Sequence, residues 1–118
     1  MLDGILFDSI HEARRYSELK LLERAGKITD LELQKKFILI PAQLGKSTEV
    51  YKRGANKGEP KPGPVLEREV AYFADFVYKE NGVQIVEDAK SVATRKKESY
   101  IIKRKLMLQV YGIRIREV

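Results

Sequence analysis

Two aspartates and a lysine occupy two consecutive β-forming runs of this sequence. Asp75 lies in the first run, and Asp88 and Lys90 lie in the second. Asn81 and Gly82 separate the runs, and Asn-Gly between alternating hydrophobic residues is the strongest short-range signal for a two-residue hairpin loop. With that turn, the two residues that flank it face each other. Counting outward from them brings Asp75 directly opposite Asp88.

This register places two acids and one base on a single surface. Carboxylates directly opposite each other have Cβ atoms roughly 5 Å apart and destabilise a sheet unless a cation offsets their charge. Because strand side chains alternate, Lys90 shares the face of Asp88, whereas Glu87 and Ala89 point to the other face. A pair of carboxylates suits Mg²⁺, and a neighbouring lysine can orient water or stabilise charge on a phosphoryl oxygen.

The alternative interpretation is that these charges are solvated hairpin residues. Most charged side chains lie on the surface, and Lys90 could form a diagonal salt bridge there. Asp75, however, stands between Phe73 and Val77 on its own face of an apolar run. A charge that serves only solubility is least expected at such a position.

The composition indicates a basic, globular protein of one domain. The 118 residues include no cysteine, which excludes disulfides and cysteine-ligated zinc. The net charge is +6 and the sequence pI is about 9.5, as expected for a partner of polyanions. The start of the chain lacks the basic region of a secretory signal, and no apolar run is long enough to span a membrane. We therefore expect a cytoplasmic protein.

The basic residues gather in two segments of the chain. A charge run is usually only a solvated face, so each cluster alone is weak evidence for nucleic-acid binding. The first cluster is Lys46, Lys52, Arg53, Lys57 and Lys61, and the second is Arg95, Lys96, Lys97, Lys103, Arg104 and Lys105.

The hydrophobic pattern predicts six regular elements and one long loop. The expected order is α, β, β, β, α, β, within a single domain at 1–118. The loop, at about 42–66, is rich in Gly, Pro, Lys and Ser, and we expect a flexible basic arm there. The predicted elements are a helix from Ser9 to about Gly26, strands at Leu31–Ile40, about 69–79 and 83–90, a helix at Arg95–Tyr111 and a strand at Ile113–Val118.

One short motif resembles a known site, the single histidine forms none, and Glu12 has two possible roles. Gly45-Lys46-Ser47 resembles the end of a P-loop, but the upstream glycine and the following helix are missing. His11 is the only histidine and has no partner for a zinc site. Glu12 lies three residues after Ser9, so it fits a capping box at the helix start, and a catalytic role fits it equally well.

Together, these residues resemble the PD-(D/E)XK nuclease superfamily. Within it, the chain resembles small phage-encoded proteins in four motifs, at Phe7–Tyr16, Leu31–Gln34, Ala74–Tyr78 and Glu87–Lys90. The resemblance implies an α/β fold with a restriction-endonuclease-like αβββαβ core, in which helices flank a mixed sheet. It also implies roles for the site residues: Asp75 and Asp88 as metal ligands, Lys90 as the active-site lysine, and Glu12 as the helix acid of the branch similar to phage endonuclease I.

The chemistry that follows is hydrolysis of DNA phosphodiesters. We expect Mg²⁺, for which Mn²⁺ can substitute, held by Asp75, Asp88, the Ala89 carbonyl and Glu12. By resemblance, the substrate is branched DNA such as a Holliday junction, cut by a homodimer in phage recombination or packaging, in the host cytoplasm. The alternatives are a non-catalytic nucleic-acid-binding module and a less selective nicking or end nuclease. The expected DNA contacts are Lys46, Lys52, Arg53, Lys57, Lys61, Lys96, Lys97 and Lys103.

Overall fold

The structure is a computed structural model that describes residues 2–118. It divides the chain into two compact units. The first unit runs up to Phe37 and resumes at Tyr72, and the second unit is Ile38–Ala71. All of the predicted catalytic residues belong to the first unit.

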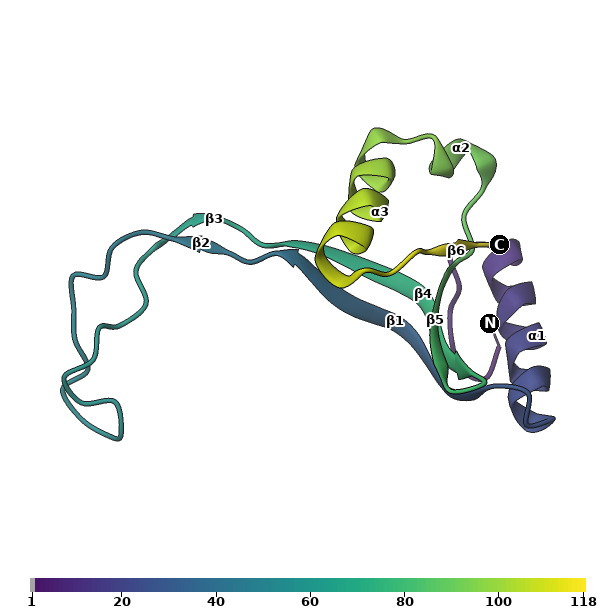
Figure 1. The fold of residues 1–118 in the computed structure, drawn as a ribbon, viewed down its shortest axis with the longest axis horizontal. Helices are drawn as coiled ribbons and strands as arrows, with labels where there is room; N and C mark the ends of the chain where they lie inside the picture. The colour runs from purple at the N-terminus through teal and green to yellow at the C-terminus, as the bar shows by residue number, and fades with distance from the viewer. Residues whose placement is uncertain (1) are drawn as a thin grey trace. The chain divides into compact units, whose positions relative to one another are not determined.

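The first unit is built on a mixed sheet with the strand order β1-β4-β5-β6 (Figure 1). β5 pairs with β4 in antiparallel fashion and with β6 in parallel fashion. The parallel pairing requires a crossover, which α2 and α3 supply. These findings confirm the predicted α/β class. The elements are α1 (Ile10–Arg24), β1 (Thr29–Ile40), β4 (Val70–Glu80), β5 (Val83–Asp88), α2 (Val92–Arg95), α3 (Glu98–Tyr111) and β6 (Arg116–Glu117).

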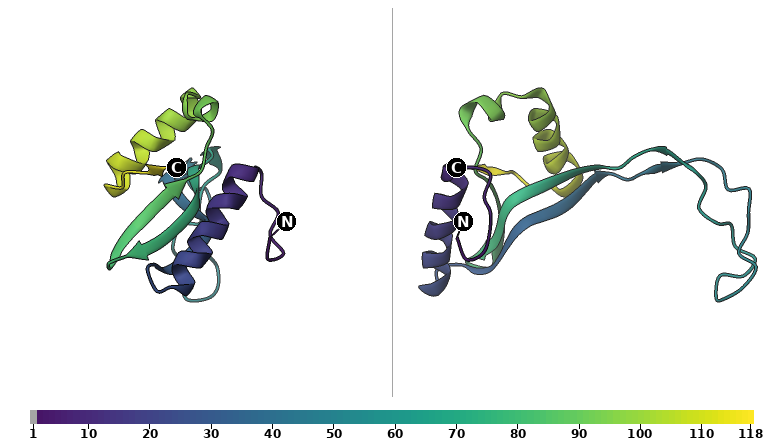
Figure 2. Two further views of the ribbon diagram at one scale, coloured as in Figure 1. Left: turned by 90° about the vertical axis from the view of Figure 1, so that its right-hand side faces the viewer. Right: turned by 180° about the vertical axis from the view of Figure 1, so that it is seen from behind.

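Helices lie on both sides of this sheet. α1 covers one face, and α3 lies on the other side (Figures 1 and 2). The face beneath α1 holds an apolar cluster in which Tyr16 and Leu19 pack with the strand residues Phe76 and Tyr78. On the opposite face, a buried cross-strand pair of valines at 77 and 86 continues the core. The middle of β4, from Ala74 to Tyr78, is therefore buried on both faces, which explains its apolar run.

The β4–β5 hairpin has the predicted register. Glu80 pairs with Val83 across the turn, and the pairing continues regularly to Phe76 and Glu87. Asn81 and Gly82 have φ of 52° and 76°, which is the left-handed conformation that a type I′ turn requires at both central positions. The local turn chemistry therefore favours the pairing that is observed between the two strands.

A buried ion pair fastens α1 to the hairpin. Glu87 is completely buried and accepts two hydrogen bonds from Arg15, at 2.7 Å from Nε and 2.8 Å from Nη2. The hydroxyl of Tyr78 donates a third hydrogen bond to the same carboxylate. Glu87 is thus fully engaged beneath α1, on the face that the alternation of β5 predicts for it.

The remaining differences from the predicted elements are local. The helix predicted from Arg95 is two helices: Ser91 caps the short α2, and α3 begins only at Glu98. The last strand is confined to Arg116–Glu117, and β5 ends at Asp88. None of the helices formed by residues 2–118 is both long and apolar enough to cross a membrane.

The second unit contains more order than a plain loop. β2 (Gln43–Leu44) and β3 (Val65–Glu67) pair in antiparallel fashion, and the Gly45 N–H donates to the Pro64 carbonyl at 2.8 Å. Gly63 has to be glycine, because a Cβ there would collide with the Gly45 backbone. Pairs this short leave no readable period in the sequence, so the pattern at 42–66 predicts only a loop.

Candidate active site

The structure brings Asp75, Asp88 and Lys90 together. Both aspartates are buried, with exposed fractions of 1% and 0%. The Lys90 Nζ atom lies 3.2 Å from Asp75 Oδ2 and 3.3 Å from Asp88 Oδ1. Ala89 lies between Asp88 and Lys90 in the sequence, but it packs into the apolar cluster beneath α1. The predicted clustering of two acids and one base on a single face is confirmed.

Asp75 is held as a carboxylate by donors on three sides. The Ala89 N–H donates to Oδ2 at 2.9 Å, and the Gln34 Nε2 atom donates to Oδ1 at 3.0 Å. Burial alone would raise the pKa of Asp75, but a side-chain hydrogen bond with Asp88, the Lys90 ammonium and the bonds from Ala89 and Gln34 together hold that pKa below its usual value. Of the two aspartates, Asp75 is therefore the one whose surroundings favour the ionised form.

Asp88 is much less well satisfied. Tyr72 donates its hydroxyl to Oδ2 at 2.8 Å. Oδ1, in contrast, accepts no hydrogen bond from residues 2–118, although Lys90 lies close to it. Burial, followed by the proximity of Asp75, raises the pKa of Asp88 to about 7. The ion pair with Lys90 compensates the burial of Asp88 Oδ1, and two buried carboxyl groups beside one ammonium call for an explanation.

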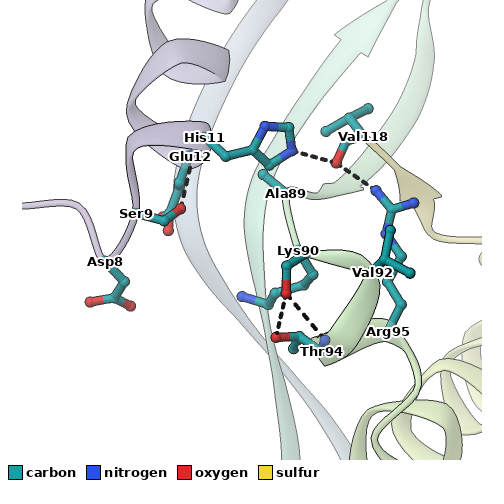
Figure 3. Close-up of a pocket in the computed structure, with 11 residues that line it drawn as sticks. Asp8, Ser9, His11, Glu12, Ala89, Lys90, Val92, Thr94, Arg95 and Val118 are labelled. Atoms are coloured by element: carbon teal, nitrogen blue, oxygen red, sulfur yellow. Dashed lines mark hydrogen bonds between the residues drawn. The ribbon is translucent and has the colours of Figure 1, made fainter.

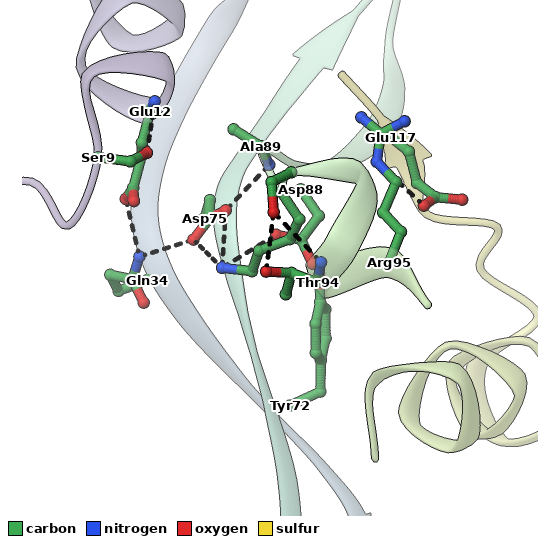
Figure 4. A network of polar contacts seen from close by, with 12 residues as sticks. Ser9, Glu12, Gln34, Tyr72, Asp75, Asp88, Ala89, Thr94, Arg95 and Glu117 are labelled. Carbon is green, nitrogen blue, oxygen red and sulfur yellow. Dashed lines mark hydrogen bonds and ion pairs between the residues drawn. The ribbon is translucent and has the colours of Figure 1, made fainter. Parts of the chain in front are cut away.

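Glu12 approaches the two aspartates from the start of α1 (Figure 4). Its backbone N–H donates to Ser9 Oγ at 3.1 Å, which confirms Ser9 as the helix cap. The reciprocal bond of a capping box, from the Ser9 N–H to the Glu12 carboxylate, is not found within residues 2–118. The Glu12 Oε1 atom accepts instead from Gln34 at 3.3 Å. The carboxylate of Glu12 therefore points to the site.

Burial and the charge of Asp75 raise the pKa of Glu12. Figure 4 shows Gln34 between Glu12 and Asp75, with a hydrogen bond to each. The sequence pattern assigns no role to Gln34, because a glutamine in a strand carries no distinctive signal. Only its inclusion in the motif at Leu31–Gln34 singles it out.

A cavity of about 600 Å³ opens beside Glu12 and Lys90 (Figure 3). His11 and Arg95 stand on its walls, and both contact the Val118 carbonyl, with N–O distances of 2.7 Å. Its other polar lining includes the hydroxyls of Ser9, Ser91 and Thr94. The cavity thus offers hydrogen-bonding groups directly next to the clustered charges.

The predicted DNA-contacting residues are divided between the two units. Lys96 and Lys97 are exposed and Lys103 is half-buried, all in the first unit. Of the five in the second unit, Lys46, Lys52, Arg53 and Lys57 are exposed, and Lys61 is half-buried with its Nζ atom 3.5 Å from a Glu49 carboxylate oxygen. Their role in binding DNA stays a prediction.

The donor set is small for a metal site. Residues 2–118 contain no group of three or more His, Cys, Asp or Glu side chains arranged to hold an ion. Asp75 and Asp88 form a pair, and Glu12 joins them only through Gln34. The predicted Ala89 carbonyl ligand stays a prediction, because it is the N–H of Ala89 that bonds to Asp75.

Comparison with known proteins assigns the chain to a family. A family model described as "Protein of unknown function (DUF1064)" matches residues 1–116. The chain belongs to the DUF1064 family. No curated protein and no solved structure matches this DUF1064 chain. The family description names no activity, so any functional argument has to come from the site.

Proposed function

We propose that this protein is a metal-dependent DNA endonuclease of the PD-(D/E)XK type. The observation that supports the proposal best is the pair of buried aspartates, both in ion-pair contact with a lysine on the same sheet face. A protein that needed only stability would not keep this arrangement, because buried like charges cost free energy. Functional sites are where such costs are usually retained.

The residues fit a hard divalent cation. Mg²⁺ is bound by one or two carboxylates and keeps several waters, so it does not need a cage of protein ligands. Asp75 and Asp88 would hold it, with Glu12 and the Ala89 carbonyl as further ligands. A cation between the carboxylates would offset their mutual repulsion and would allow both buried aspartates to be ionised.

The proposed reaction is in-line hydrolysis of a phosphodiester. When bound, the cation supplies Lewis-acid stabilisation of charge on the phosphoryl oxygens. The Lys90 ammonium, held by the two aspartates, is positioned to orient the attacking water or to stabilise the developing charge. Its charge is secure, because the nearby carboxylates outweigh burial and raise the pKa of Lys90.

The substrate part of the proposal is branched DNA. The cavity beside Lys90 would receive the sugar-phosphate next to the scissile phosphate, and the basic residues of both units would contact the backbone. A four-way junction requires two matched cuts, so the active form would be a homodimer. A nicking or end nuclease is the enzymatic alternative, and a non-catalytic binding module is the other.

One assay separates these possibilities. Branched and linear duplexes of equal length are incubated with the protein, with and without Mg²⁺ or Mn²⁺. We expect cutting only with metal, and faster cutting of the junction. Equal cutting of linear and branched DNA would support the less selective nuclease. Binding without cutting in every condition would support the non-catalytic binding module. In parallel, Tb³⁺ luminescence sensitised by tyrosines such as Tyr72 reports metal binding directly.

The second unit provides a test of the DNA contacts. Residues 46–63 are replaced by Asn-Gly, which can close the hairpin because Gly45 already bonds to Pro64. We expect weaker DNA binding and a salt dependence reduced by about 0.9 in log–log slope for each phosphate that the shortened protein no longer neutralises. Filter binding of a cleavage-deficient variant at several salt concentrations measures both quantities.

The control for this replacement keeps the length of the second unit and removes only the positive charges predicted to contact DNA. Glutamine replaces the five basic residues Lys46, Lys52, Arg53, Lys57 and Lys61. The same loss of affinity in both variants would assign the effect to charge. An unchanged affinity and salt slope in both would exclude this segment from DNA binding.

A further inference from the structure

Gln34 has a backbone conformation that is unusual for a strand residue. Its φ is 51°, in the left-handed region, although it lies in the middle of β1. This region costs an ordinary L-residue roughly 1–3 kcal/mol and is retained where the surroundings impose it, often at functional sites. The residue is neither a glycine nor an asparagine, which tolerate the conformation best.

The strand changes face at this residue. Before it, Leu33 packs against the apolar cluster beneath α1. After it, the ring of Phe37 contacts Tyr111 at the end of α3, with centroids 5.4 Å apart. Strand residues four positions apart normally face the same side, so an irregularity has to lie between them. The backbone at Gln34 supplies it, and glycine could supply it as well.

The side chain of Gln34 does something that glycine could not do. Its Nε2 atom donates to Glu12 Oε1 at 3.3 Å and to Asp75 Oδ1 at 3.0 Å. An amide nitrogen has two hydrogens, so both bonds form at once. The two acids come from different elements, α1 and β4, and they would repel each other without a donor between them.

We propose that Gln34 is the positioning residue that holds the helix acid Glu12 at the metal site. Its amide binds one oxygen of each carboxylate and leaves the other oxygen of Glu12 available to a cation. The inference rests on the proposed function and explains why the third acid reaches the site through an amide. Partners that orient ligands in this way typically change metal affinity by about 10- to 100-fold.

The test uses Gln34→Gly, which keeps the left-handed backbone and removes the amide. Affinity for Tb³⁺, and for Mg²⁺ by competition, is measured without DNA, together with the melting temperature. We expect affinity to fall about 10-fold or more while the melting temperature is maintained, because glycine adopts this φ without strain. Gln84→Gly, at an exposed position on β5, is the matched control. It should lower the melting temperature and leave metal affinity unchanged.

Glu12→Gln completes the design. Glutamine can still accept from Gln34 and serve at the helix start, but it is a poor ligand for a hard cation. The double variant combines Gln34→Gly with Glu12→Gln. If Gln34 acts through Glu12, this double variant binds metal no more weakly than Glu12→Gln alone. Full affinity in Gln34→Gly, or fully additive losses, would refute the positioning role. Absence of metal binding and cleavage in the parent protein would instead refute the proposed function.

Discussion

Asp75→Asn and Asp88→Asn are expected to abolish metal-dependent DNA cleavage, with a loss of at least about 10³-fold in rate. Each substitution removes a charged oxygen ligand without changing the volume of the side chain. DNA binding should be unchanged or slightly tighter, because affinity comes mainly from Lys and Arg contacts with phosphates. Single-turnover cleavage and filter binding of the same preparations measure the two effects separately.

The metal-free stability of the same variants is an internal control. Asp88→Asn should melt at a higher temperature than the parent without metal, because it relieves the crowding of two buried carboxylates. Addition of Mg²⁺ should then stabilise the parent and not the variant. Cleavage retained by either folded variant would contradict the proposed role of the pair.

Arg15→Ala is expected to produce the largest loss of stability, about 3–5 kcal/mol in the free energy of unfolding. It leaves the completely buried carboxylate of Glu87 without its cation and without two hydrogen bonds. Denaturant unfolding monitored by circular dichroism measures the change. Lys20→Ala, which removes a partly exposed ion pair, is the control and should cost less than about 1 kcal/mol.

A double variant separates the cost of an unpaired charge from the value of the ion pair. Arg15→Met with Glu87→Leu removes both charges and keeps most of the volume, so much of the stability should return. The Tyr78 hydroxyl would still accept a hydrogen bond from Arg116 Nη1, at 3.1 Å. A double variant as unstable as Arg15→Ala would show that the pair contributes through its specific geometry and not only through charge balance.

The parts of the site that follow from local chemistry could be predicted from the sequence. Asn81-Gly82 fixes the hairpin register, and the alternation of β5 then places Asp88 and Lys90 on one face. Ser9 and Gly26 mark the ends of α1 because caps are local signals.

The parts that depend on distant contacts could not be predicted. The left-handed φ of Gln34 accompanies a change in the face that β1 packs, and no neighbour in the sequence indicates it. The carboxylate of Glu12 could equally close a capping box, and only the position of α1 over the sheet turns it toward Gln34. The break between α2 and α3 also escapes the pattern, because charged residues at 96 and 97 fit a helix as well as a linker.

The ion pair beneath α1 also has a consequence for how the chain selects its native pairing. β5 carries acids in both phases, Glu87 and Asp88, so a slip of one residue in the hairpin would still put a carboxylate opposite Asp75. Only in the native register does Glu87 face α1, where its side chain, longer than that of Asp88, accepts two hydrogen bonds from Arg15. The Arg15–Glu87 pair beneath α1 therefore favours the native register of the hairpin over a register shifted by one residue.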